Sequence, residues 1–321
     1  MPTTKTDSVI LDTIVHLRLG TRRSPLALAQ SGMMARALEA AHSDLHGGGL
    51  TVELVPIVTT GDVVTGDLAR FGGKGLFTQE LESGLLDGSL DLAVHSLKDL
   101  PVTLPPGLIL AALPRRADAR DVLVSELAED LDGLPEGAIV LTGALRRRAQ
   151  ILMRRPDLRV EPLRGNVDTR IRKWRETGAG GVILAGAGLD RLALTGLPAH
   201  PITPEVLLPA PGQGTLALET REGSHAFTLC QALNDLPTAR AAEAERRVVA
   251  AFGGDCSLPL AAWARAEGND LRLTALLATP DGKYFARGEA VGATPEEAAE
   301  ACVAAMRAGG AEGVLMRIRT A

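Results

Sequence analysis

The first part of the chain alternates short apolar runs with amphipathic stretches of helical length, a pattern that predicts strand–loop–helix units. Serine and proline at 24–25 start a predicted helix through about residue 41. A second helix is expected at 77–86. Strands are predicted at 17–19, 50–59, 92–94 and 108–113. Strands alternating with helices indicate an α/β lobe.

The same alternation returns after a charged crossing at 115–121. Its strands are predicted at 122–125, 138–141, 158–163 and 181–185. The proline-rich stretch 200–219 then predicts a second crossing, with a strand at 216–218 that returns to the first lobe. Two crossings between two α/β lobes describe a hinged cleft like that of periplasmic binding proteins.

From about residue 237 the pattern changes to that of a small α+β domain. Its elements are predicted as a helix at 238–251, a loop GGDCSLPLAA, a hairpin of strands 271–277 and 284–289, a helix at 295–308 and a strand at 313–318. We therefore expect an α/β chain of two periplasmic-binding-protein-like lobes joined by two crossings, plus a small α+β C-terminal domain. The expected divisions are 1–115 with 215–233, 116–214, and 237–321.

Composition limits the class of protein. A chain of 321 residues suffices for two or three domains, and no apolar run approaches the roughly 20 residues of a membrane helix. The opening residues lack the basic start and apolar core of a signal peptide, which predicts a cytoplasmic protein. Three cysteines without CxxC spacing and six scattered histidines predict neither a disulfide framework nor a metal site. A net charge of −5 and 2% aromatic residues argue against nucleic-acid binding.

The stretch DLAVHSLKDLP carries the first candidate chemistry. It predicts a buried strand that ends before a proline turn, which places Lys98 and Asp99 just past the carboxyl end of a strand. Ligands of open α/β sheets bind at such ends. The lysine could hold an anionic substrate while the aspartate moves a proton. The alternative is a loop with a solvated ion pair.

Arginines are concentrated between residues 144 and 175, where ten arginines and one lysine accompany three acidic residues. This density predicts an anionic partner, because the planar guanidinium grips carboxylate or phosphate. Periodicity places Arg146 and Arg147 at the start of a helix, Arg164 after a strand and Arg170 near the next helix. Three sources of arginine therefore converge on one edge.

Other basic residues carry weaker signals. TRRSPLALAQ places Arg22 and Ser24 at a helix start, which is either an anion site or only a helix cap. GGKGLF lacks the spacing of a P-loop and predicts a mobile loop that carries Lys74. Arg154 and Arg155 are expected to be solvated at a helix end.

Cys256 lies on a predicted loop bounded by glycines. A lone cysteine is usually a buried structural residue. A loop cysteine between glycines is more accessible, which makes Cys256 a candidate for covalent attachment as well. The residues alone leave both interpretations open.

From about Leu17 to its end, the chain resembles the porphobilinogen deaminase family, also called hydroxymethylbilane synthases. The resemblance rests on motifs in the family's order: TRRSPLALAQ, GGKGLFTQELE, DLAVHSLKDLP, LRRRAQ, LRGNVDTR, AGLDRL, LPAPGQG and GGDCSLP. It implies a transferase of haem biosynthesis that joins four porphobilinogen molecules head to tail and releases ammonia each time. The chain grows on a dipyrromethane cofactor bound by a thioether.

The resemblance also implies roles residue by residue. Cys256 would attach the dipyrromethane, and Asp99 would be the catalytic carboxylate. Cofactor binding is implied for Lys98, Ser24, Thr142, Arg146, Arg147, Arg170 and Arg191, and substrate binding for Arg22, Arg164, Arg170, Lys74, Phe77 and Gln213. Each ring carries two carboxylates, so the growing chain needs many cations. Porphobilinogen is the expected partner of a monomer without metal, nucleic acid or membrane.

Three features depart from the family's pattern. Gly143 and Ala144 stand where the family usually has two serines, so hydroxyl contacts to the cofactor are expected to be lost. Arg148 could compensate. Asp255 would raise the pKa of a neighbouring thiol. A non-catalytic binder of an anionic ligand is the rival hypothesis, but it predicts no use for Cys256 or Asp99.

Overall fold

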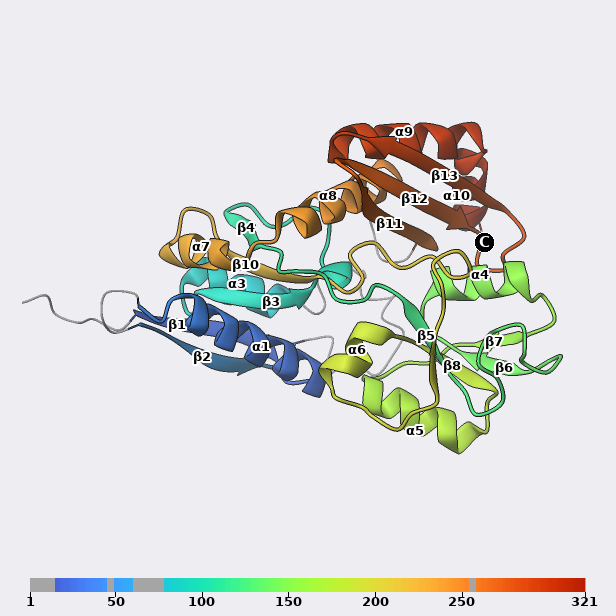
Figure 1. Cartoon of the computed structure of the whole chain (residues 1–321), viewed down its shortest axis with the longest axis horizontal. Coiled ribbons are helices and arrows are strands. Elements are labelled where there is room, and N and C mark those ends of the chain that lie inside the picture. Colours follow the sequence, from blue (N-terminus) through green and yellow to red (C-terminus); the bar gives the residue numbers. More distant parts are fainter. Residues whose placement is uncertain (1–14, 45–48, 60–77, 254–257, 321) are drawn as a thin grey trace, which may run out of the picture.

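The computed structural model describes residues 15–44, 49–59, 78–253 and 258–320. They form two five-stranded mixed sheets and one three-stranded antiparallel sheet, each in a separate part of the molecule (Figure 1). In the described residues, no helix combines the length and the apolar character that crossing a bilayer requires. The two-lobe α/β architecture with a third α+β unit is confirmed.

The first lobe is built on a sheet of order β2-β1-β3-β10-β4. Its strands are β1 (Val15–Arg22), β2 (Leu50–Ile57), β3 (Leu92–Ser96), β4 (Leu108–Ala112) and β10 (Leu216–Arg221). β1 is parallel to β2 and β3, whereas β10 runs antiparallel between β3 and β4. The carboxyl ends of β1 and β3 therefore share one edge, which faces the second lobe (Figure 1).

Helices cover both faces of this sheet. α1 (Pro25–Ala41) and α7 (His225–Cys230) pack on the face that carries Leu19, Leu92 and Leu218. α3 (Gln79–Asp87) covers the opposite face, through Leu81 and Leu85. Successive side chains of a strand point to opposite faces of the sheet, so alternate residues of these strands pack on the two layers of helices.

The second lobe repeats this arrangement, with the order β7-β6-β8-β5-β9. Its strands are β5 (Asp121–Val124), β6 (Ile139–Leu141), β7 (Arg159–Glu161), β8 (Gly181–Ala185) and β9 (Ala199–Pro201). β6 is parallel to β7 and β8, and β5 is antiparallel to β8 and β9. In each sheet the antiparallel inner strand directly follows a crossing between the lobes. β5 follows the first crossing, and β10 follows the second. Three helices follow the parallel strands: α4 (Leu145–Arg154), α5 (Val167–Thr177) and α6 (Gly186–Arg191).

The third unit packs helices on one antiparallel sheet (Figure 1). Its elements are α8 (Leu236–Ala251), β11 (Leu260–Glu267), β12 (Asp270–Ala278), β13 (Phe285–Gly292), α9 (Pro295–Ala308) and α10 (Ala311–Thr320). A complete capping box at Thr294 and Glu297 starts α9. Phe252, Cys302 and Met306 lie in the core between helices and sheet.

Several predicted features were wrong. Residues 313–318 belong to helix α10 and not to a strand. The loop expected through residue 262 is shorter, because β11 already begins at Leu260. Arg155 is only partly solvated: its side chain is 17% exposed and donates hydrogen bonds to the Leu131 carbonyl and the Asp157 carboxylate. The prediction for Arg154 is confirmed, because its side chain is exposed and pairs with Asp132.

One buried carboxylate joins the crossings to the third unit. Glu245 of α8 is fully buried and accepts a 2.6 Å hydrogen bond from Arg116, which lies on the first crossing. It also accepts from the backbone amides of Gly212, on the second crossing, at 2.5 Å and of Ala264, in β11, at 2.8 Å. The two crossings and the third unit therefore meet at a single side chain.

Candidate functional site

The edge of the first lobe presents Lys98 and Asp99. Directly after β3 the backbone enters a short 3-10 helix, Leu97–Asp99, whose Leu97 is buried and anchors the turn. Asp99 is exposed at this edge. Asp99 lies close enough to Lys98 for its negative charge to raise the lysine's pKa. The predicted position past a strand end is confirmed.

Ser24 lies at the same edge, where β1 leads into α1. Its side chain caps the helix and accepts a hydrogen bond from the Ala27 amide at 3.3 Å. The predicted helix cap at Ser24 is therefore confirmed, and its anion-binding role stays a prediction. The cap leaves the hydroxyl proton of Ser24 able to donate to a ligand. Arg22 ends β1 two residues earlier.

The edge of the second lobe presents two helix N-termini. α4 follows β6 and α5 follows β7, and neither N-cap residue, Ala144 or Asn166, caps its helix with a side chain. Uncapped amides and the helix dipole both favour an anion at such an end. Thr142, just before α4, is buried and accepts from the Ala144 amide at 3.3 Å.

Arg146 and Arg147 extend from the first turn of α4 to Asp121, the first residue of β5. Arg146 donates to the Asp121 carboxylate at 2.7 Å and Arg147 at 2.6 Å. All three side chains are buried, with Asp121 at 0% exposure. Despite its burial, the two guanidiniums hold the pKa of Asp121 well below its usual range.

Gln213 connects this cluster to the first lobe. Its carbonyl oxygen accepts from Arg146 at 2.9 Å and from Lys98 at 3.4 Å. Its amide nitrogen donates to Asp121 and to the Ala119 carbonyl, both at 2.7 Å. Both polar atoms of this buried amide are hydrogen-bonded to protein groups. Because these groups come from both lobes, Gln213 links the lobes. Its direct contact with substrate stays a prediction.

Burial and nearby cations together lower the pKa of Lys98 to about 8. Desolvation contributes most, and Arg147 and Arg146 add repulsion, while Asp99 opposes the shift. Such a lysine is charged at neutral pH but close to losing its proton. A bound carboxylate would favour the charged form.

Arg170 and Arg191 approach the same region from α5 and α6. Arg170 donates to the Gly165 carbonyl at 2.7 Å, and Arg191 donates to the Gly214 carbonyl on the second crossing at the same distance. Burial lowers the pKa of both guanidiniums. The charge of Asp99 counteracts this shift at Arg170, which places the two residues near each other across the lobes.

The chemistry of this edge fits a ligand rich in carboxylates. Among the described residues, Lys98, Arg146, Arg147 and Arg170 bring four positive charges to a region that holds the carboxylates of Asp99 and Asp121. The Nε atom of Arg147 is buried and makes no hydrogen bond within the described residues. An unpaired buried donor is costly unless a ligand accepts from it. Arg164 lies after β7, on the segment that leads to α5.

Three predicted site residues, Lys74, Phe77 and Cys256, lie outside the described residues. Gly143 is one of the positions at which the sequence departs from the family's pattern, and the structure gives a physical reason for the glycine. A Cβ atom there would lie 2.5 Å from the Leu163 carbonyl oxygen. The Arg148 guanidinium donates to the Val160 carbonyl, so this backbone group already uses part of it. The proposed compensation by Arg148 stays a prediction.

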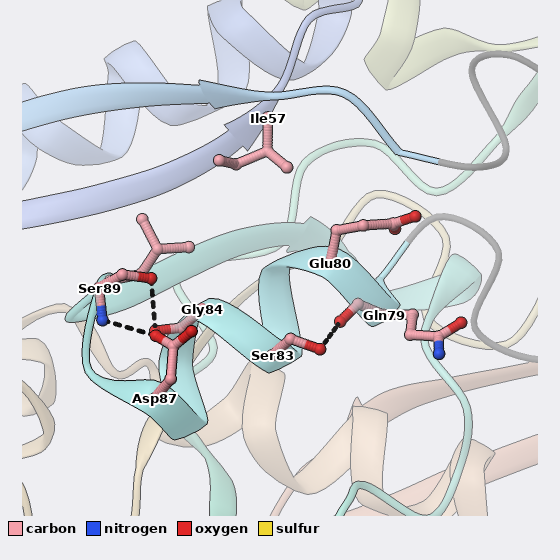
Figure 2. Close-up of a pocket in the computed structure, with 8 residues that line it drawn as sticks. Ile57, Gln79, Glu80, Ser83, Gly84, Asp87 and Ser89 are labelled. Atoms are coloured by element: carbon pink, nitrogen blue, oxygen red, sulfur yellow. Dashed lines mark hydrogen bonds between the residues drawn. The ribbon is translucent and has the colours of Figure 1, made fainter.

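A pocket of about 390 Å³ opens elsewhere on the first lobe, between the end of β2 and α3 (Figure 2). Its described lining includes Glu80, Ser83, Asp87 and Ser89 but no lysine or arginine. Two carboxylates in the wall would repel a polycarboxylate. The described part of this pocket therefore offers no cation to an anionic ligand.

Asp121 is the main site residue that sequence reasoning missed. It was interpreted only as the end of a charged crossing. Its partner Arg146 lies 25 residues further along the chain, and no local pattern joins the two. The one available signal was an aspartate as the first residue of a buried strand, DVLV.

Comparisons with known proteins show which family this chain is similar to. A family model described as "Porphobilinogen deaminase, dipyromethane cofactor binding domain" matches residues 17–228, and "Porphobilinogen deaminase, C-terminal domain" matches residues 239–308. A porphobilinogen deaminase from Syntrophotalea carbinolica is 49% identical over 268 residues, covering 83% of this chain and 84% of its own. One from Rubrobacter xylanophilus is 47% identical, covering 95% and 98%.

A porphobilinogen deaminase from Brevibacillus brevis is 42% identical over 306 residues, covering 94% of this chain and 97% of its own. Among solved structures, the methionine-binding protein MetQ covers 70% of this chain and 92% of its own. Its TM-score of 0.42 and its 14% identity are too low to carry an argument.

Proposed function

The chain belongs to the porphobilinogen deaminase family, and on that premise we propose which of its residues carry each step of the reaction. It is a transferase that polymerises porphobilinogen into the linear tetrapyrrole hydroxymethylbilane, on a dipyrromethane cofactor. The observation that carries our assignment is the edge between the lobes, where Arg146 and Arg147 pair with Asp121 while the charge of Asp99 acts on Lys98 and Arg170.

We propose that this edge binds the acetate and propionate groups of the cofactor and of porphobilinogen. The proposed cations are Arg146, Arg147, Arg164, Arg170 and Arg191 from the second lobe, and Lys98 and Arg22 from the first. Arginine forks suit carboxylates because they donate two parallel hydrogen bonds. Ser24 and Thr142 add hydroxyl groups beside helix starts, where anions are favoured.

Asp99 is the proposed catalytic residue. As the aminomethyl C–N bond of porphobilinogen breaks, ammonia leaves and positive charge develops on the pyrrole ring. A carboxylate fixed at this position stabilises that charge and can accept a hydrogen bond from the pyrrole N–H. The position supports the role, because Asp99 follows a buried strand, is adjacent to Lys98 in the chain and acts on Arg170 through its charge.

Cys256 is the proposed attachment point of the dipyrromethane. The described residues on both sides are well anchored: α8 ends at Ala251, and β11 begins at Leu260 within the core sheet. The buried cysteines Cys230 and Cys302 are poor alternatives, because burial raises the pKa of each thiol to about 12. Thioether formation needs an accessible sulfur.

Several predictions rest on the sequence and the family alone. We keep Lys74, Phe77 and Gln213 as substrate-binding residues, and we propose a cytoplasmic monomer. The division into 1–115 with 215–233, 116–214 and 237–321 is supported by the three sheets, since each sheet's strands fall within one division.

Intact mass spectrometry tests the proposal. The purified protein should exceed its sequence mass by two pyrrole units and should give the colour of a dipyrromethane with acidic Ehrlich's reagent. Cys256→Ala should abolish both signals. Asp99→Asn should keep the extra mass and lose nearly all turnover of porphobilinogen. Unmodified wild-type protein, or full turnover by Asp99→Asn, would refute the corresponding role.

A further inference from the structure

Asp121 occupies an unusual position for a carboxylate. It starts β5, directly after the first crossing, and its side chain is fully buried where the lobes meet. A buried carboxylate is tolerated only when cations and hydrogen-bond donors surround it. Nothing in the proposed chemistry uses Asp121 directly, so its burial needs a separate reason.

Four hydrogen bonds converge on this carboxylate. Oδ2 accepts from Arg146 at 2.7 Å, while Oδ1 accepts from Arg147 at 2.6 Å, from Gln213 at 2.7 Å and from Arg146 again at 3.3 Å. The two guanidiniums also donate to the backbone carbonyls of Leu208 and Ile183. Asp121 therefore fixes the direction of both arginines.

The cluster keeps an excess of positive charge even so. In the part of the chain that the structure describes, the three cations Arg146, Arg147 and Lys98 are balanced by two carboxylates, Asp121 and the exposed Asp99. The Gln213 carbonyl oxygen accepts from both Lys98 and Arg146. The Nε–H of Arg147 is buried and has no acceptor among the described residues. The arrangement thus partly neutralises the arginines while it leaves a donor for an incoming anion.

We propose that Asp121 is a positioning residue, a resident counter-ion that holds Arg146 and Arg147 in their binding geometry before the cofactor's carboxylates arrive. This inference rests on the proposed function of the cleft. Without Asp121, two adjacent buried guanidiniums would repel each other and lose their orientation. The bound cofactor would replace part of the missing negative charge. Asp121 therefore matters most to the cofactor-free protein and to cofactor loading.

The test uses Asp121→Asn, which keeps the shape and removes the charge. The full chain is produced in cells that cannot make porphobilinogen, and cofactor loading after addition of porphobilinogen is followed by intact mass. We expect loading to slow by at least about tenfold. We also expect the cofactor-free form to lose more thermal stability than the loaded form.

Asp118→Asn is the matched control. Asp118 lies on the same crossing and pairs with Arg120, but both side chains are about two-fifths exposed. This variant should load and melt like the wild type. Equal losses of stability in the loaded and cofactor-free forms of Asp121→Asn would reveal a purely structural role and overturn the proposal. Loading at the wild-type rate would do the same.

A double variant keeps the test valid if Asp121→Asn does not fold. Asp121→Asn with Arg147→Gln removes one charge of each sign and should recover the stability of the cofactor-free protein. Because Asp121 acts through the arginines, the double variant should load no more slowly than Arg147→Gln alone. Additive slowing would contradict the proposal. A wild type that never gains mass would instead refute the proposed function itself.

Discussion

At the scale of single residues, Lys98 predicts a pH dependence of substrate capture. Burial and the repulsion of Arg146 and Arg147 lower its pKa to about 8, so the ammonium loses its proton as the pH rises through that value. A neutral amine no longer attracts a carboxylate. We therefore expect kcat/KM for porphobilinogen to fall above about pH 8, because this ratio reports the free enzyme.

Lys98→Arg is the control for this prediction. Arginine keeps its charge throughout the range, so the fall in kcat/KM should move to higher pH even if the absolute activity drops. The measurement is a pH profile of both proteins between about pH 6 and 10. An unchanged fall in the variant would assign the titration to another group.

The two described cysteines predict selective thiol chemistry. Burial raises the pKa of Cys230 and Cys302 to about 12, so at pH 8 roughly one thiol in ten thousand is ionised. Neither should react with iodoacetamide in the native protein, and both should react after unfolding in denaturant. Peptide mapping of the alkylated sites checks this. Native labelling of either residue would mean that its part of the core opens readily.

At the scale of elements, we expect the buried Glu245 of α8 to stabilise the contact between the two crossings and the third unit. Glu245→Gln leaves the partly buried Arg116, whose side chain is 13% exposed, without its ionic partner, and weakens the contacts to Gly212 and Ala264. Breaking a buried pair in this way costs about 3–5 kcal/mol of the free energy of unfolding. Denaturant unfolding measures the loss.

Glu243→Gln is the matched control on the same helix. Glu243 pairs with Arg247, but both side chains are about half exposed. Removing this pair should change the free energy of unfolding by less than about 1 kcal/mol. Equal losses in the two variants would show that Glu245 has no special role in joining the crossings to the third unit.

The elements also show how far the sequence predicts the fold. Helix 295–308 was predicted with the observed bounds because proline, threonine and glutamate mark its start. The run 313–318 was too short to separate helix from strand by its pattern. In α10, Val314, Leu315 and Ile318 lie on the buried side, a helical spacing that becomes evident only against the core.

Strand β11 was not predicted, because its local sequence does not favour a strand. Its sequence LAAWARAE is rich in alanine, which has little preference for strands. Pairing along the whole of β12 and burial in the core hold it extended. Long-range contacts override local preference here, as they do at Asp121, whose role depends on partners distant in the chain. The site residues at strand ends were predictable, because their position follows from the alternation of strands and helices.

At the scale of the whole molecule, the charge distribution is strongly uneven. The net charge is −5, yet the edge between the lobes gathers Lys98, Arg146, Arg147 and Arg170. Such local concentration attracts a polycarboxylate against the overall repulsion. The attraction is screened by salt, since the Debye length falls from about 10 Å at 0.1 M to about 3 Å at 1 M.

We therefore expect kcat/KM for porphobilinogen to fall several-fold as sodium chloride rises from about 0.05 to 0.5 M. Two variants of one helix locate the source. Arg170→Gln removes a cation near Asp99 and should flatten the salt dependence. Arg172→Gln removes an exposed arginine paired with Glu176, and should leave it unchanged. If both variants kept the wild-type salt dependence of kcat/KM, Arg170 would not contribute to substrate capture. If kcat/KM of the wild type did not change with salt, the cationic edge would not attract the substrate at all.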